Sequence, residues 1–242
     1  MSLAPPAPLR LPPAVQQHRF ATAAQTAQAL AIAVARNLKD GVQRRGRAAL
    51  IVAGGRTPIA FLDHLARQPL AWSDVSVSLT DERCVPADHP DRNEALVRRH
   101  LLQDCAASAR FVPLLGPGAD CEQLQLAQQA LASLPWPSDV VVLGMGEDGH
   151  VASLFAGAEG SAPALDARSA ERVALVAPST APHRRISLTL SALLDTRAVM
   201  ILIQGEGKRI AIERAADADP LVHPIGAFLG QQSVPVHLYY SP

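Results

Sequence analysis

The sequence has few aromatic residues, no net charge and no long apolar run. Phe, Trp and Tyr make up only 4% of its 242 residues, which is sparse for a protein that stacks the bases of single-stranded nucleic acid. Lys plus Arg equals Asp plus Glu, at 22 each, so no overall field attracts DNA or an acidic membrane. No segment approaches the roughly 18 consecutive apolar residues that cross a bilayer. We therefore expect no nucleic-acid or membrane partner, and any charged ligand must be held by a local site.

Cysteine is scarce as well. The three cysteines, Cys84, Cys105 and Cys121, form no C-x-x-C pair. Such a set is typical of free thiols in a reducing compartment and does not favour a zinc site. The first segment, MSLAPPAPLRLPPAV, is interrupted by prolines before an apolar block can form, so it does not resemble a signal peptide. We expect a cytoplasmic protein with a loose, proline-rich stretch at residues 1–20.

Two kinds of apolar segment alternate along the rest of the chain. Continuous Val, Ile and Leu runs predict buried strands, at residues 47–55, 74–83, 139–144, 172–178, 198–203 and 234–240. Apolar stripes at helical spacing predict helices, at residues 21–38, 57–68, 92–102, 121–134 and 209–217. A further segment, 184–196, begins strand-like and turns helical.

This alternation predicts an α/β fold with one doubly wound, mostly parallel sheet and helices on both faces. The sheet and its helices fill a single catalytic domain, residues 21–242, with a small excursion near 104–136 and a loop at 156–170. Thr57 is expected to be the N-cap of the second helix, with Pro58 at its first position.

In an open parallel sheet, ligands bind beyond the carboxyl ends of the strands. Four loops that follow predicted strands read AGGRTP, TDERCVP, GMGEDGH and QGEGKR. In the first loop, Gly54 and Gly55 let backbone N–H groups approach an anion, and Thr57 adds a hydroxyl. This loop is also compatible with a plain strand-to-helix turn. Arg83 and Lys208 fall on the same rim, however, and two cations beside a glycine loop favour a phosphate site.

Three familiar glycine motifs are not supported. GMGEDG matches the dinucleotide-binding pattern G-x-G-x-x-G, but that fold needs a full crossover helix after the loop. Here Gly157, Gly160 and Pro163 limit any following helix to a short one. QGEGKR fails as a phosphate-binding Walker loop, because Leu202 and Arg209 occupy its first glycine and its Ser/Thr positions. A G-x-S-x-G elbow is absent, which disfavours a serine hydrolase.

His150 directly follows the last glycine of GMGEDG. An imidazole with a pKa near 6.5 can act as a base around neutral pH. Asp148 can orient this ring or bind a substrate hydroxyl. The alternative is that His150 starts a helix and Asp148 forms a turn, but the glycine loop and the cationic rim favour catalysis. These residues suggest a sugar-phosphate enzyme that uses water or proton transfer and needs no metal or cofactor.

Four stretches together resemble the 6-phosphogluconolactonases of the pentose phosphate pathway, within the glucosamine-6-phosphate isomerase/6-phosphogluconolactonase superfamily. They are AGGRTP, TDERCVP with HPDRNEALVRRHLL, LGMGEDGHVASLF, and RRISLTLSALLDTRAVMILIQGEGKR. The match spans about residues 50–240. It implies a fold similar to that of the glucosamine-6-phosphate deaminases, and cofactor-free hydrolysis of 6-phosphoglucono-δ-lactone to 6-phosphogluconate.

The resemblance also implies roles for single residues. His150 would be the general base that activates water, and Asp148 and Asp81 would position His150 or sugar hydroxyls. Arg83 and Lys208 would bind the 6-phosphate. The remaining binding groups implied are in two glycine loops, at Gly54, Gly55, Arg56, Thr57 and Gly146. Donors near Gly146 to His150 are candidates for stabilising the oxyanion.

The chain departs from the family pattern at two places. Many members carry Ser where this chain has Arg56, and continue SLFP where it has SLFAG.

The deaminases are the nearest alternative, but they normally show DEY and a Phe-Asn-Glu run where this chain has DER and ASLF. A sugar-phosphate sensor and a lactonase for other phosphorylated lactones are further alternatives. We expect a monomer or weak dimer.

Overall fold

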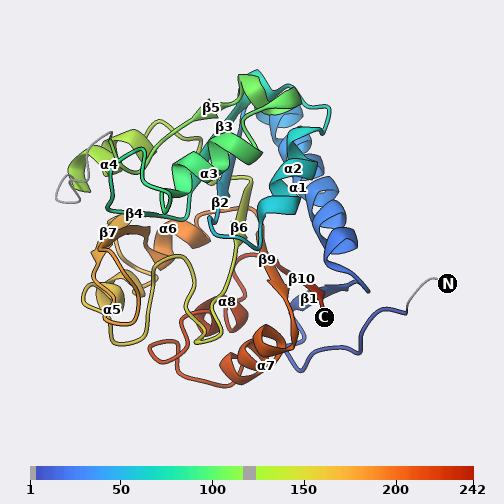
Figure 1. The fold of residues 1–242 in the computed structure, drawn as a ribbon, viewed down its shortest axis with the longest axis vertical. Helices are drawn as coiled ribbons and strands as arrows, with labels where there is room; N and C mark the ends of the chain where they lie inside the picture. The colour runs from blue at the N-terminus through green and yellow to red at the C-terminus, as the bar shows by residue number, and fades with distance from the viewer. Residues whose placement is uncertain (1–3, 117–123) are drawn as a thin grey trace.

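A computed structural model describes residues 4–116 and 124–242 of the chain (Figure 1). Its centre is a seven-stranded sheet in which every neighbouring pair of strands is parallel. In spatial order the strands are β1 (Val15–Arg19), β10 (Val236–Ser241), β9 (Val199–Gln204), β6 (Val140–Leu143), β2 (Ala48–Val52), β3 (Val75–Leu79) and β5 (Arg110–Phe111). The predicted parallel α/β sheet is therefore confirmed.

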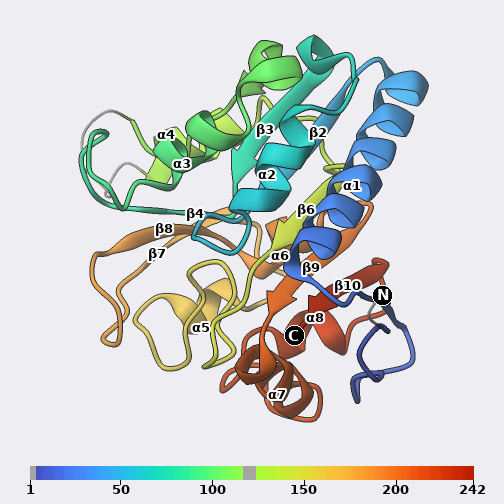
Figure 2. The same ribbon diagram turned by 45° about the vertical axis from the view of Figure 1, so that its right-hand side comes forward.

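Helices connect these strands. They are α1 (Ala23–Arg45), α2 (Ile59–Ala66), α3 (Asn93–His100), α4 (Leu124–Leu131), α5 (Ser161–Ala164), α6 (Leu190–Leu194), α7 (Glu206–Ala215) and α8 (Gly226–Leu229), with short 3-10 turns η1 (Trp72–Asp74) and η2 (Asp104–Ser108). The long helix α1 begins where the Thr22 hydroxyl accepts a hydrogen bond from the Gln25 amide, and it ends at Gly46 in the left-handed conformation. Figures 1 and 2 show α1 and α2 side by side.

The central strands form the core because they are apolar throughout. Every residue of β2 and β6 is buried, and so is all of β9 except Gln204. A strand that is buried on both faces needs apolar side chains on both of them. Its apolar residues therefore form a continuous run and do not alternate with polar ones. The path from β2 to β3 runs opposite to the path from β6 to β9, so right-handed crossovers place helices on both faces.

The order of the strands also positions the site. From β2 the chain moves outward to β3 and β5, and it then returns to the other side of β2 as β6 before continuing to β9 and β10. The loops that follow β2 and β6 therefore diverge from two adjacent strands. Such a switch point opens a crevice at the carboxyl ends of the strands, where ligands bind in this class of sheet.

A second sheet was not predicted. It contains three antiparallel strands, in the order β4 (Asp81–Arg83), β8 (Arg185–Leu188) and β7 (Val173–Val176), and it lies beside the central sheet in Figure 2. The predicted strand 74–83 is interrupted at Thr80, so that its DER segment belongs to this smaller sheet. The predicted strand 172–178 belongs there too. An apolar run predicts a strand but not its sheet, because the pairing partner is distant in the chain.

The N-terminal boundary also requires correction. Residues 15–19, which we expected to be loose, form the edge strand β1 and pair in parallel with β10. Leu9 is buried, and its backbone N–H and C=O both bond to the side chain of Gln17. Prolines exclude a helix here but permit an edge strand after the last of them. That residues 21–242 form one domain remains a prediction.

Three local predictions differ from the structure. Helix α2 has Pro58 as its N-cap, so Thr57 does not cap it. No helix directly follows GMGEDGH, and α5 lies inside the predicted loop 156–170. Part of the predicted excursion, β5, returns to the central sheet as its other edge. The start of the predicted helix 121–134 lies outside the described residues.

The cysteines only partly match the expectation of free thiols. Cys84 is disulfide-bonded, Cys105 is free and exposed, and Cys121 lies outside the described residues. Spacing along the chain does not reveal which sulfur atoms meet in space. No helix in the described residues combines the length and apolarity needed to cross a bilayer.

Candidate active site

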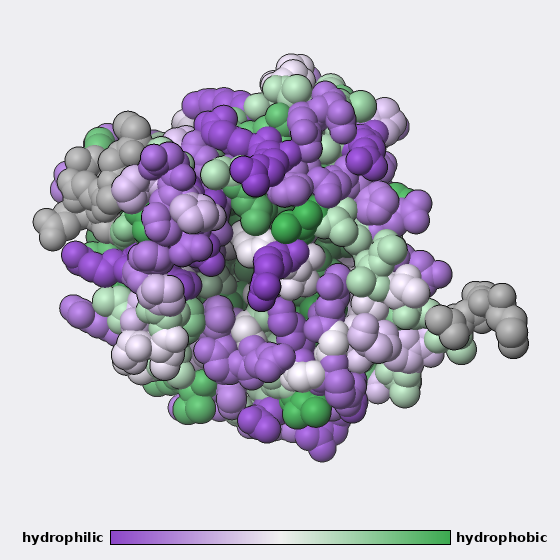
Figure 3. Space-filling view, viewed as in Figure 1, coloured by the Kyte–Doolittle hydropathy of each residue, from purple (hydrophilic) through white to green (hydrophobic). Residues whose placement is uncertain are grey.

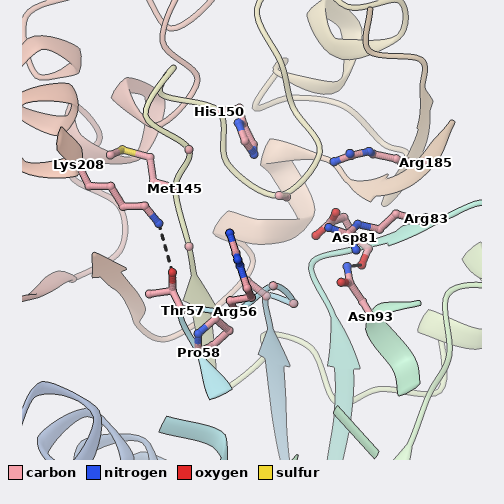
Figure 4. Close-up of a pocket in the computed structure, with 16 residues that line it drawn as sticks. Arg56, Thr57, Pro58, Asp81, Arg83, Asn93, Met145, His150, Arg185 and Lys208 are labelled. Carbon is pink, nitrogen blue, oxygen red and sulfur yellow. Dashed lines mark hydrogen bonds between the residues drawn. The ribbon is translucent and has the colours of Figure 1, made fainter. Parts of the chain in front are cut away.

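A cavity of about 250 Å³ lies at the switch point of the central sheet. Its walls come from the loops after β2 and β6, from β4 and β8 of the smaller sheet, and from the first turns of α3 and α7 (Figure 4). The face drawn in Figure 3 is hollowed near its centre, and both hydrophilic and hydrophobic residues border the hollow. Nine of the ten predicted site residues line this cavity: Gly54, Gly55, Arg56, Thr57, Asp81, Arg83, Gly146, His150 and Lys208.

The tenth residue, Asp148, does not line the cavity but holds His150. The two side chains meet at 2.6 Å, between His150 Nδ1 and Asp148 Oδ1. Asp148 Oδ1 also accepts the backbone N–H of His150 at 3.2 Å. The hydrogen bond from His150 keeps the pKa of the Asp148 carboxyl below its ordinary value, so the acid is charged at neutral pH. A charged acceptor requires the proton on Nδ1, which leaves Nε2 of a neutral ring as a base.

The loop that carries this pair has little freedom. The His150 ring stacks on Phe155 with centroids 4.1 Å apart. A Cβ on Gly146 would lie 2.2 Å from His150 Nδ1 and 2.3 Å from Asp148 Oδ1, so only glycine fits beneath the pair. Gly149 has a φ of +82°, which favours glycine as well. Figure 4 shows the His150 ring directed toward the space between the other labelled side chains.

One wall of the cavity is the glycine loop after β2. Gly55 adopts a φ of +88°, and the Thr57 hydroxyl accepts a hydrogen bond from Lys208 Nζ at 3.3 Å. Burial lowers the pKa of the Lys208 ammonium, and the nearby Glu147 carboxylate opposes this shift. Thr57 therefore serves to hold the lysine rather than to cap α2. Arg56 is exposed, and Figure 4 shows it reaching up beside this wall.

The opposite wall carries two arginines around a buried acid. Asp81 accepts hydrogen bonds from the hydroxyls of Thr80 and Ser153, at 2.9 and 2.6 Å. Arg83 donates from Nη1 to the Asp91 carbonyl at 2.6 Å. Figure 4 shows Arg83 and Arg185 together beside Asp81, across the cavity from Lys208. The two predicted cations, Arg83 and Lys208, thus approach the cavity from opposite sides.

Arg185 is a site residue that the sequence did not reveal. It is buried, with the guanidinium 5.0 Å from the centre of the Phe155 ring. Burial lowers its pKa, an effect that the Asp81 carboxylate opposes. Its Nε has no hydrogen-bond partner among the described residues. A buried cation with an unused donor at a cavity wall is suited to an anion. Its only signal was the doubled arginine of RRISL, in a strand whose sheet was not predicted.

Asn93 is a second residue that was not predicted, and it aligns the glycine loop with Asp81. Its side-chain amide donates to the Asp81 carbonyl at 2.9 Å, and its backbone N–H donates to Glu82 Oε1 at 2.8 Å. A Cβ on Gly54 would lie only 2.0 Å from Asn93 Oδ1. The absence of a side chain at Gly54 thus lets the first turn of α3 approach the loop.

The comparisons with known proteins agree with this site. A family model described as glucosamine-6-phosphate isomerases/6-phosphogluconolactonase matches residues 21–236. The chain belongs to this family. The predicted resemblance is therefore confirmed, and the motifs that carried it lie around the cavity.

Individual members of the family are similar to the chain over nearly its whole length. The chain is 42% identical over 233 residues to a 6-phosphogluconolactonase of Pseudomonas aeruginosa, covering 96% of this chain and 98% of that protein. The crystal structure of a 6-phosphogluconolactonase from Shewanella baltica matches with a TM-score of 0.91 and 37% identity, over 97% of this chain and 100% of that one. A monomeric glucosamine-6-phosphate deaminase matches with a TM-score of 0.74 at 20% identity, over 93% and 96%. The last match confirms the expected similarity to the deaminase fold.

Proposed function

We propose that this chain hydrolyses 6-phospho-D-glucono-1,5-lactone to 6-phosphogluconate in the oxidative pentose phosphate pathway. Relatives that are about 40% identical over nearly the whole chain are named 6-phosphogluconolactonases. The observation that carries the proposal is the His150–Asp148 pair at the edge of a cavity with cations on two sides. This arrangement provides a base for water and binding groups for a phosphate.

The reaction follows from the position of the free ring nitrogen. His150 Nε2 takes a proton from water while the water oxygen bonds to the lactone carbonyl carbon. The tetrahedral oxyanion then collapses and breaks the bond between this carbon and the ring oxygen. The departing alkoxide takes the proton back from His150, which restores the neutral base and yields the acid, ionised at neutral pH. Asp148 keeps the imidazole in the required tautomer and stabilises its charged form.

The substrate phosphate lies between the two cationic walls in this proposal. Lys208 and Thr57 approach it from one side, and Arg83 and Arg185 from the other. The N–H groups of the Gly54–Gly55 loop add donors, as at other phosphate sites. Asp81 accepts a sugar hydroxyl, because a carboxylate can accept further hydrogen bonds beyond the two from Thr80 and Ser153.

The test supplies two substrates in parallel. A glucose-6-phosphate dehydrogenase generates the lactone in place, and acid release is followed above the spontaneous rate of hydrolysis. Glucosamine 6-phosphate is offered separately, and ammonia is measured. Rapid acid release without ammonia supports the lactonase. Ammonia without lactone hydrolysis would assign the chain to the deaminase branch of the family.

A third outcome would argue against both catalytic functions. If neither reaction occurred but 6-phosphogluconate still raised the melting temperature, the cavity would be a binding site without turnover. The catalytic role of His150 would then be wrong, although the placement of the phosphate would stand. A set of other phosphorylated lactones, assayed in the same way, tests selectivity among them.

A further inference from the structure

Three metal-ligating side chains meet outside the proposed active site. They are His89 and Asp91, in the segment after β4, and His183, in the segment before β8. One ligand atom from each lies within 4.8 Å of those from the other two. His183 Nε2 and Asp91 Oδ2 already approach to 3.1 Å. The rings of His89 and His183 meet edge to face, with centroids 5.3 Å apart.

We infer that His89, Asp91 and His183 form a binding site for a divalent transition metal such as Zn²⁺. Two imidazoles and one carboxylate, with a fourth position left to water, are a ligand set that this ion uses in proteins. Zn–N and Zn–O bonds of about 2.1 Å place tetrahedral ligand atoms about 3.4 Å apart. The pair formed by His183 and Asp91 has nearly this spacing, so chiefly the His89 ring must rotate inward.

The topology explains why the three residues meet. Strands β4 and β8 are antiparallel neighbours in which Arg83 pairs with Arg185. The segment that leaves β4 and the segment that enters β8 therefore run from the same end of the small sheet. Each brings a histidine to this junction, and a metal would join the two segments. Ligand spacing along the chain could not predict such a site, because His183 lies about ninety residues after His89 and Asp91.

Metal binding has an identifiable cost. The Asp91 backbone N–H donates to His89 Nδ1 at 3.1 Å. A neutral ring that binds metal through one nitrogen carries its proton on the other, so this hydrogen bond must open. Asp91 is exposed, and water can satisfy the released N–H. Arg83 also opposes a cation, since it donates to the Asp91 carbonyl, while the Asp91 carboxylate compensates for part of its charge.

Calorimetric titration of the full chain with Zn²⁺, in a buffer that does not bind the metal, tests the site. We expect one saturable Zn²⁺ per chain, reversed by EDTA. The variants are His183→Asn and His89→Gln. Asn is chosen at position 183 because its φ of +69° lies in a region that asparagine tolerates. Loss of an outer partner costs about 10–100-fold in metal affinity, so removing a direct ligand should weaken binding by at least about tenfold.

The controls separate this site from other ligands. His64→Gln removes a histidine from α2, and Cys105→Ser removes the exposed thiol; both should bind Zn²⁺ as the parent chain does. Melting temperatures without metal show whether each variant folds. If one of the histidine variants does not fold, Asp91→Asn is used in its place. The inference would be overturned if the parent chain showed no saturable binding, or if His183→Asn and His89→Gln both bound Zn²⁺ with the affinity of the parent chain. The outcome does not depend on lactone hydrolysis, because neither histidine belongs to the proposed catalytic groups.

Discussion

The contact between Gly54 and Asn93 gives the most specific prediction about the architecture of the site. Alanine at position 54 would place its Cβ 2.0 Å from Asn93 Oδ1, and Asn93 is 2% exposed, so it cannot move into solvent. Overpacking in a core costs about 1–3 kcal/mol. Displacing Asn93 also removes its hydrogen bond to the Asp81 carbonyl, which is worth about 1 kcal/mol. We expect Gly54→Ala to lower the free energy of unfolding by about 2–4 kcal/mol.

Thermal and urea unfolding measure this loss. For a chain of this length, 1 kcal/mol corresponds to about 2–4 °C in melting temperature, so Gly54→Ala should melt roughly 4–16 °C lower. Gly144→Ala is the matched control, because its new Cβ would meet nothing closer than the Ala53 Cβ at 4.0 Å. It should change stability by no more than about 0.5 kcal/mol.

A double-mutant cycle decides whether the clash is the cause. In an Asn93→Ala background the obstructing amide is absent, so adding Gly54→Ala should cost less than about 1 kcal/mol. The reasoning is refuted if Gly54→Ala destabilises both backgrounds equally, since the cost would then come from the backbone of the loop and not from Asn93.

Three further predictions concern charge and catalysis. Asp148→Asn should lower kcat by about 10²–10⁴-fold with little change in KM, because the neutral amide no longer stabilises protonated His150 and its NH2 group can donate to Nδ1, so the His150 tautomer is no longer fixed; an unchanged kcat in steady-state assays would argue against that role. Lys208→Ala should weaken substrate binding by about 1.5–3 kcal/mol, as for a hydrogen bond to a charged group, seen as a raised KM; a loss confined to kcat would exclude a binding role. Burial raises the pKa of Glu82 from 4.5 to about 7, so the folded chain binds more protons than the unfolded chain between these values. Stability should therefore fall by at most about 3 kcal/mol as pH rises through this window, and Glu82→Gln should remove that slope in urea unfolding at several pH values; parallel curves for both proteins would contradict it.

The central strands and the rim of the site could be predicted because each depends on local sequence. Continuous apolar runs predicted β2, β6 and β9, and the segments that follow them carry the Gly54–Gly55 turn, His150 and, in the first turn of α7, Lys208. Parallel strands bring their carboxyl ends to one edge of the sheet. Residues that directly follow different strands are therefore predicted to meet there.

The features that were missed depend on contacts between distant parts of the chain. The smaller sheet exists because β4 pairs with β8 about a hundred residues later, and nothing in either segment alone indicates its partner. Arg185 became recognisable only when β8 placed it, buried, against Phe155. The edge strand β1 and the junction of His89 with His183 have the same origin. Local patterns specify elements, whereas pairing between distant segments determines which elements meet.

The central claim is that His150 is the base of a lactone hydrolase, and His150→Ala tests it most directly. Turnover of enzymatically generated 6-phosphogluconolactone is measured above the spontaneous rate, and 6-phosphogluconate binding is measured in parallel by its effect on melting temperature. We predict that turnover falls by about 10²–10⁴-fold, while 6-phosphogluconate stabilises the variant as it does the parent chain. Full activity in His150→Ala would contradict the proposed mechanism, because turnover would then not require the His150 imidazole as its base.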